Sequence, residues 1–301
     1  MISAVYGRLS GNARGALWML ASAVAFTLMT SLIKYLGGNY SPALQAFYRQ
    51  AAGLMVLAPV ILRNPKAALT ATRPGILLFR SAAGAIAMIF AFWAYQELPL
   101  AEANALSFTR TLWIVPLAMF VLGEKIGPWR MGATFAGFGG VLLMLQPTLA
   151  NASGWPAAAA LGSALLFATT VTGVKMLTRD HSTTVLISWA AILGLVFATP
   201  LALIEWRWPA PLDLVLLALM GALGLVTQLC YLRGMALGDA AAMAPIDYTR
   251  LIFAILMGLV LFGEIPNLVT MAGALIVIGS TLVITLRELH FQKKPPPVRA
   301  D

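Results

Sequence analysis

Several charged side chains lie deep inside long apolar stretches of this sequence, among them Arg49, Arg110, Asp247 and Arg250. A charge at the centre of a membrane span costs roughly 2.5–3.5 kcal/mol on insertion scales, so it faces a water-filled cavity or a partner. Guanidinium groups bind carboxylates and phosphates through paired N–H donors. These residues therefore predict a polar site for a small solute inside an apolar protein.

Arg110 and Arg250 follow a threonine in two similar segments, Thr109-Arg110 and Thr249-Arg250. Asp247 lies three residues before Arg250, a spacing at which helical side chains can pair. For Arg250, both structural pairing and a place on a transport pathway therefore remain open. Arg110 has no acid at three- or four-residue spacing in its stretch and is the stronger ligand candidate.

Other polar residues surround these arginines in the sequence. Asn104 and Ser107 share a helical face with Arg110, and Tyr48 precedes Arg49, which could bind an anion or extend toward a membrane surface. Contacts between helices explain the remaining tyrosines and Gln228 equally well. The predicted substrate-binding residues are Arg110, Arg250, Arg49, Tyr48, Asn104, Ser107, Tyr95, Gln228 and Tyr248. Asp247 and Glu102 are the candidates for coupling to protons.

No enzyme signature accompanies these residues. The sequence has no His-Glu-x-x-His, no Gly-x-Ser-x-Gly and no phosphate-binding loop. With one cysteine, two distant histidines and no acidic cluster, neither a metal site nor a cofactor is expected. Energy for transport would then come from an ion or solute gradient.

The composition indicates that lipid is the main solvent. The chain is 60% hydrophobic and 10% charged, with a mean hydropathy of +0.86, whereas soluble domains carry about 25% charged residues. Its basic character, with a pI of 10.1, suits an anionic lipid surface better than nucleic acid. Ten stretches are long enough to cross a bilayer as helices: 15–36, 43–62, 74–96, 99–122, 128–146, 156–177, 184–205, 212–235, 240–262 and 267–286.

The two halves of the chain resemble each other. Leu20 and Leu161, like Lys34 and Lys175, lie 141 positions apart, and Glu124 and Glu264 lie 140 apart. Five spans per half give the halves opposite orientations, so the predicted fold is an all-α membrane protein of ten transmembrane helices in two inverted five-helix repeats. The expected boundaries are an N-terminus at 1–14, repeats at 15–147 and 156–286, a linker at 148–155 and a tail at 287–301.

The charges at the span ends predict orientation, since cytoplasmic loops are enriched in Lys and Arg. Two of these residues, Lys34 and Arg207, fall at one set of ends. Fourteen fall at the other set, which predicts that both termini are cytoplasmic: Arg8, Arg14, Arg63, Lys66, Arg73, Lys125, Arg130, Lys175, Arg179, Arg233, Arg287, Lys293, Lys294 and Arg299.

Small residues recur every four positions in the fifth span, at Gly132, Ala136 and Gly140. They let helix backbones approach closely. Packing within one chain is favoured over a dimer interface as their role.

The pattern Ala-x₃-Ala-x₂-Phe-Thr-Arg…Gly-Glu, from Ala101 to Glu124, is followed by Gly139-Gly140-Val141-Leu142-Leu143 and Gln146-Pro147. In this order the motifs resemble those of the EamA-type branch of the drug/metabolite transporter superfamily, and Gly263-Glu264 and Gly279 repeat their ends. The resemblance implies a bacterial inner-membrane carrier with a central cavity and alternating access. Members of the superfamily move amino acids, riboflavin, S-adenosylmethionine, metallophores and other metabolites in either direction.

The sequence therefore predicts a secondary transporter of an anionic, zwitterionic or acceptor-rich metabolite. A passive channel and an exporter of a metallophore or toxic metabolite are the alternatives. The sequence does not specify the substrate, the direction, the coupling ion or the oligomeric state.

Overall fold

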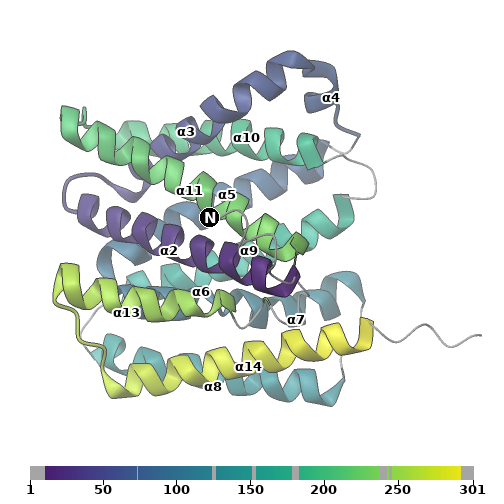
Figure 1. Cartoon of the computed structure of the whole chain (residues 1–301), viewed down its shortest axis with the longest axis vertical. Coiled ribbons are helices and arrows are strands. Elements are labelled where there is room, and N and C mark those ends of the chain that lie inside the picture. Colours follow the sequence, from purple (N-terminus) through teal and green to yellow (C-terminus); the bar gives the residue numbers. More distant parts are fainter. Residues whose placement is uncertain are drawn as a thin grey trace, which may run out of the picture.

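A computed structural model of the chain describes residues 11–72, 74–123, 127–150, 154–177, 183–237, 243 and 246–292. This described part consists of helices joined by short connections and contains no strand (Figure 1). Its helices are α2 (Gly11–Gly37), α3 (Pro42–Arg63), α4 (Pro65–Leu69), α5 (Pro74–Glu97), α6 (Leu100–Ser107), α7 (Arg110–Leu122), α8 (Pro128–Ala150), α9 (Gly154–Leu177), α10 (Thr183–Ile204), α11 (Pro211–Leu237), α13 (Thr249–Phe262) and α14 (Leu268–Gln292).

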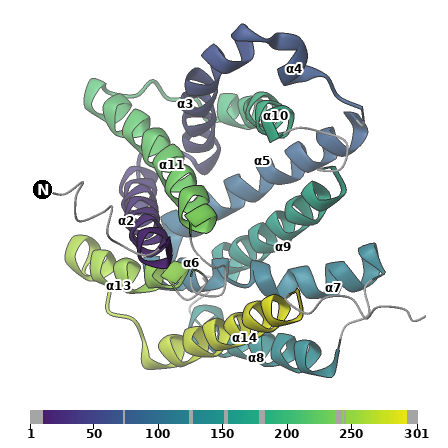
Figure 2. The same cartoon turned by 45° about the vertical axis from the view of Figure 1, so that its right-hand side comes forward.

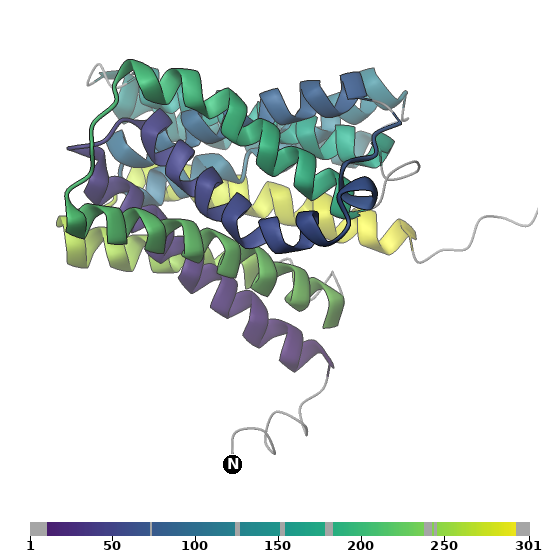
Figure 3. The same cartoon turned by 90° about the horizontal axis from the view of Figure 1, so that it is seen from above.

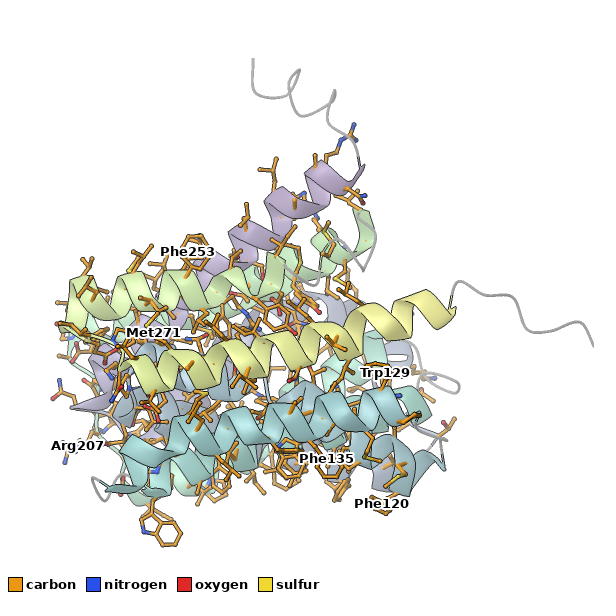
Figure 4. All side chains as sticks on the ribbon, turned by 90° about the horizontal axis from the view of Figure 1, so that it is seen from below. Phe120, Trp129, Phe135, Arg207, Phe253 and Met271 are labelled. Carbon is orange, nitrogen blue, oxygen red and sulfur yellow. The ribbon has the colours of Figure 1, made fainter. Side chains whose placement is uncertain are left out.

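Three described helices, α2, α5 and α11, are long and apolar enough to cross a membrane. Shorter apolar segments lie at Ser188–Ile204, Thr249–Phe262 and Leu268–Ile284. Large apolar side chains cover the outside of the bundle. Phe120 is 79% exposed, Phe135 70% and Trp129 67% (Figure 4). Such a surface suits contact with lipid rather than water.

The helices pack in a pattern related by the internal repeat. In sequence order, α2 corresponds to α9 and α5 to α11; the structure packs α2 on α11 and α5 on α9 (Figure 2). The corresponding helices α3 and α10 pack on each other, and so do α8 and α14. Each half therefore completes its packing with helices of the other half, which is the two-repeat architecture expected from the sequence.

The described chain begins and ends at the same end of the bundle. The start of α2 and the end of α14 lie on the same side in two perpendicular views (Figures 1 and 3). Arg207, in the connection between α10 and α11, lies at the opposite end (Figure 4). The end of the bundle where the described chain begins and finishes is the termini end, and the end that carries Arg207 is the opposite end. The site lies between them.

The contact between α8 and α14 depends on glycine. A Cβ at Gly140 would lie 2.8 Å from the carbonyl oxygen of Gly273, so the two backbones touch there. Gly132 and Ala136, expected on the same packing face, are exposed. They line a cleft of about 590 Å³ between the two helices, because the close approach is confined to the region around Gly140.

Candidate functional site

Two spans predicted as continuous helices are interrupted at corresponding positions. The first half breaks between α6 and α7, where Phe108 and Thr109 bond back to carbonyls three residues earlier, at 3.2 and 3.1 Å. In the second half a single turn residue, Tyr248, with φ −73° and ψ −11°, separates the helical residues 246–247 from α13. The hydroxyls of Thr109 and Thr249 each donate to the carbonyl three residues back, both at 2.6 Å. These bonds give the carbonyls of Leu106 and Ile246 a hydrogen bond from a side chain at each turn.

The two breaks meet in space. The rings of Phe108 and Tyr248 lie 4.7 Å apart between centroids, and these residues are repeat mates, 140 positions apart. The Tyr248 hydroxyl donates to Thr281 on α14 at 2.6 Å. The aromatic contact therefore places the irregular backbones of both halves side by side, with Arg110 and Arg250 two residues further on.

Arg250 is held from several sides. Its Nη2 donates to the Asp247 carboxylate at 2.9 Å, and its Nε donates to the Asp247 carbonyl at 3.2 Å. Its guanidinium lies over the rings of Phe26 and Phe108, at 4.7 and 4.9 Å from their centroids. Cation–π contacts of this kind orient a guanidinium and stabilise its charge. The structure thus pairs Arg250 with Asp247, as the three-residue spacing allows.

Arg110 is placed differently. Its side chain is exposed, and among the described residues no carboxylate pairs with it. Tyr231 lies within electrostatic range of Asp247, Arg110 and Arg250, and Tyr95 lies within range of both arginines, so these charged groups share one polar region. An exposed guanidinium in this region is available to an incoming anion.

Buried polar atoms lie near this region. The Tyr95 hydroxyl is buried close to the side chain of Ser107. Oδ1 of Asn104 is also buried and makes no hydrogen bond within the described part of the chain. Asn104 uses its Nδ2 to donate to the Leu100 carbonyl at 2.8 Å, and Ser107 donates to the Asn104 carbonyl at 2.7 Å. A buried polar atom without a partner costs free energy, so Oδ1 of Asn104 is suited to a ligand or to water.

The remaining predicted residues lie elsewhere. Arg49 faces α11 at Gly224 and approaches Gln50 Oε1 at 3.3 Å and Met88 Sδ at 3.4 Å, and its Nε has no described partner. Tyr48 packs 6.2 Å from Trp206 in an aromatic cluster at the end of α10. Gln228 is exposed on α11, and Glu102 is buried in the first turn of α6.

The ion pair between Lys34 and Glu264 joins the two halves at the opposite end, and the sequence did not predict it. Lys34 Nζ lies 2.5 Å from Glu264 Oε1 and donates to the Leu98 carbonyl at 2.6 Å. Glu264 Oε2 accepts the N–H of Leu100 at 2.8 Å, which caps α6. Gly263, at φ 65°, ends α13 in the left-handed conformation and turns the chain toward this pair. The internal repeat could have indicated this turn from the sequence, since Gly123 ends α7 in the same way at φ 66°.

A hollow of about 610 Å³ opens at the same end, between the connections that follow α2 and α10. Tyr40, Gln96, Trp206 and Arg207 are among its lining residues. Tyr40 donates to the carboxylate of Asp213 at 2.7 Å, and this bond, followed by burial, raises the pKa of Tyr40. The hollow therefore has a largely polar mouth. The described residues contain no cluster of three or more metal-ligating side chains.

Comparison with known proteins relates the whole chain to transporters. The sequence profile of the EamA-like transporter family matches residues 13–146 and again residues 154–286. A riboflavin transporter of Rhizobium johnstonii is 29% identical over 93% of this chain and 94% of its own length. An S-adenosylmethionine uptake transporter of Rickettsia prowazekii is 28% identical over 91% and 93%. A solved crystal structure with a TM-score of 0.60 covers 90% of this chain and 97% of its own at 19% identity, a likeness in fold alone.

Proposed function

The chain belongs to the EamA-like transporter family of the drug/metabolite transporter superfamily, and from this premise we propose that it is a secondary carrier of a small organic metabolite. The carrier would reside in a bacterial inner membrane. The observation that carries the proposal is the contact between Phe108 and Tyr248, at the short turns that interrupt one span of each repeat. Broken helices at a repeat interface form the substrate sites of many secondary transporters.

In this proposal the chain crosses the membrane ten times, as two inverted five-helix repeats at 15–147 and 156–286 joined by a linker at 148–155. Residues 1–14 and the tail at 287–301 would be cytoplasmic. The described chain begins and ends at one end of the bundle, which supports placing both termini on the same side of the membrane. The excess of Lys and Arg at that set of span ends favours the cytoplasmic side. The two halves would then have opposite orientations in the membrane, an arrangement found in many carriers that work by alternating access.

Alternating access needs a contact that closes one end of the pathway. The Lys34–Glu264 pair fits this role, because it links α2 and the start of α6 in the first half to the end of α13 in the second. Its repeat mates in the sequence are Lys175 and Glu124. The described residues exclude Glu124 and the side chain of Lys175, so their pairing at the termini end is an inference from the register alone.

The substrate would be anionic, zwitterionic or rich in acceptor oxygens. Arg110, Arg250 and Arg49 outnumber Asp247, and exposed Arg110 is available to a solute. Two relatives at nearly equal identity are named for chemically different metabolites, so the family alone does not select a substrate. Asp247 and Glu102 would be the acids available for proton coupling.

Counterflow in proteoliposomes tests the proposal. Vesicles holding the purified protein are preloaded with unlabelled riboflavin, S-adenosylmethionine or amino acids, and entry of the labelled solute is followed. A carrier gives saturable uptake that an unlabelled internal solute accelerates. Flux that neither saturates nor responds to internal solute would indicate a channel instead. Preference for outward movement under an imposed proton gradient would favour the exporter alternative.

A further inference from the structure

The internal repeat places different residues before the two arginines. Arg110 and Arg250 are mates, 140 positions apart, and the same offset relates Ser107 to Asp247. Each of these residues lies three positions before its arginine, at the edge of the broken span. The two halves therefore present the same backbone arrangement with a neutral side chain in one and an acid in the other.

This difference determines the local charge. Asp247 pairs with Arg250 through its carboxylate at 2.9 Å and its carbonyl at 3.2 Å. Ser107 instead donates its hydroxyl to the Asn104 carbonyl at 2.7 Å, and no described acid takes its place beside Arg110. Arg250 is thus paired within the protein, whereas no carboxylate in the described part of the chain forms an ion pair with Arg110.

We propose that Ser107 sets the charge specificity of the site, leaving Arg110 to bind one carboxylate or phosphate group of an organic anion. This inference rests on the proposed function, which it narrows to a substrate with one such group. Arg250 stays paired with Asp247 and, with Phe26 and Phe108, forms a rigid wall beside the bound group. The rings of Phe108 and Tyr248 lie close enough in sequence and space to contact the rest of the substrate.

A set of four ring compounds tests the inference on purified protein in nanodiscs. Phenylacetate, phenyl phosphate, phenylacetamide and phenethylamine share a ring and differ in the attached group. Binding is measured at millimolar concentrations by thermal shift and by titration. We expect at least one of the two anions to bind more tightly than the amide, and the amine to bind least. The comparison between the two anions distinguishes a carboxylate site from a phosphate site.

Three variants then test whether position 107 determines the preference for anions. Ser107→Asp gives the first half the acid of the second and should lower the affinity for the preferred anion about tenfold or more, because it occupies Arg110. Asp247→Ser is the converse change and should raise that affinity by freeing Arg250. Asn64→Asp adds the same charge at the exposed connection after α3 and should leave binding unchanged.

Ser107→Asn separates the volume of the aspartate from its charge. A loss with Ser107→Asn as large as that with Ser107→Asp would overturn the proposal, and so would equal binding of phenylacetamide and the anions. If Ser107→Asp does not remain monodisperse, the Asp247→Ser result decides the question alone. Failure of counterflow with intact anion binding would count against the carrier and not against this site.

Discussion

Lys34, near the end of α2, forms an ion pair with Glu264, two residues after the end of α13, with 2.5 Å between Nζ and Oε1. The two side chains are 14% and 16% exposed, so water screens the pair only weakly. Glu264 also accepts the Leu100 N–H, and Lys34 also donates to the Leu98 carbonyl. One pair of residues therefore fixes the relative positions of α2, α6 and α13.

Removal of either charge should destabilise the protein. Glu264→Gln leaves Lys34 without its counter-charge, and a buried group that loses its partner costs about 1–3 kcal/mol. Thermal unfolding of Glu264→Gln, Lys34→Met and the double variant measures the coupling. The double variant should cost less than the two single losses together, because the second change removes a charge that is already unpaired. Strictly additive losses would show that the pair contributes no coupling energy.

Local spacing made part of this site predictable. Asp247 and Arg250 share a helical face at three-residue spacing, and the sequence identified their pairing as one alternative for Arg250. The turn at Phe108 was not predicted, since the residues around it are ordinary apolar and polar helix residues. In the second half the sequence did indicate a bend, because Pro245 lies three residues before Tyr248 and has no backbone N–H to donate; Pro245 itself lies outside the described residues. The break in the first half does not require proline; α7 continues through Pro116.

Contacts between distant helices were the least predictable part. The placement of Phe26 over Arg250 and of Lys34 beside Glu264 depends on how α2 packs against α13, which no short window of sequence contains. The offset between the two repeats does indicate which residues correspond, because it aligns Phe108 with Tyr248 and Ser107 with Asp247. Alignment of the two halves with each other is thus the sequence analysis that reveals most about the site.

Orientation can be measured with single cysteines in a Cys230→Ser background. Ala210→Cys lies in the exposed connection between α10 and α11, and Asn64→Cys lies in the exposed connection after α3. We expect an impermeant maleimide added to intact spheroplasts to label position 210 and to spare position 64, because Lys and Arg concentrate at the latter end. Both cysteines should react after lysis. Labelling of position 64 alone in intact cells would invert the orientation.

The contact between α8 and α14 should tolerate no side chain at Gly140. An alanine Cβ there would lie 2.8 Å from the Gly273 carbonyl oxygen and 2.9 Å from the Cβ of Ile276, so the two helices must separate. Gly139 is the matched control, since a Cβ at that position has no neighbour within 4 Å. Gly140→Ala should lower the unfolding temperature, while Gly139→Ala should be neutral or slightly stabilising because alanine favours a helix. Equal unfolding temperatures for the two variants would contradict this packing.

Proton coupling, if present, should depend on Asp247. Its carboxylate contacts Arg250 in the shared polar region, where protonation would release the arginine. Asp247→Asn should therefore abolish uptake driven by a pH gradient while solute exchange across the membrane remains measurable. Gradient-driven uptake and exchange are compared in the same proteoliposome preparation. Uptake that still follows the pH gradient in Asp247→Asn would exclude this residue from the coupling mechanism. Glu102 would then be the next candidate for the proton-carrying acid.

Arg110 should contribute most to substrate binding, because no carboxylate in the described part of the chain forms an ion pair with it. Arg110→Lys keeps the charge but loses the planar pair of donors, so affinity should fall about tenfold if a carboxylate or phosphate is held by two N–H groups. Arg110→Ala should abolish measurable binding while the protein remains monodisperse, since the exposed side chain makes no structural ion pair in the described chain. Titration and size-exclusion chromatography of both variants separate these effects. An Arg110→Ala protein that binds like the wild type would exclude Arg110 from the site, whereas one that aggregates would assign it a structural role.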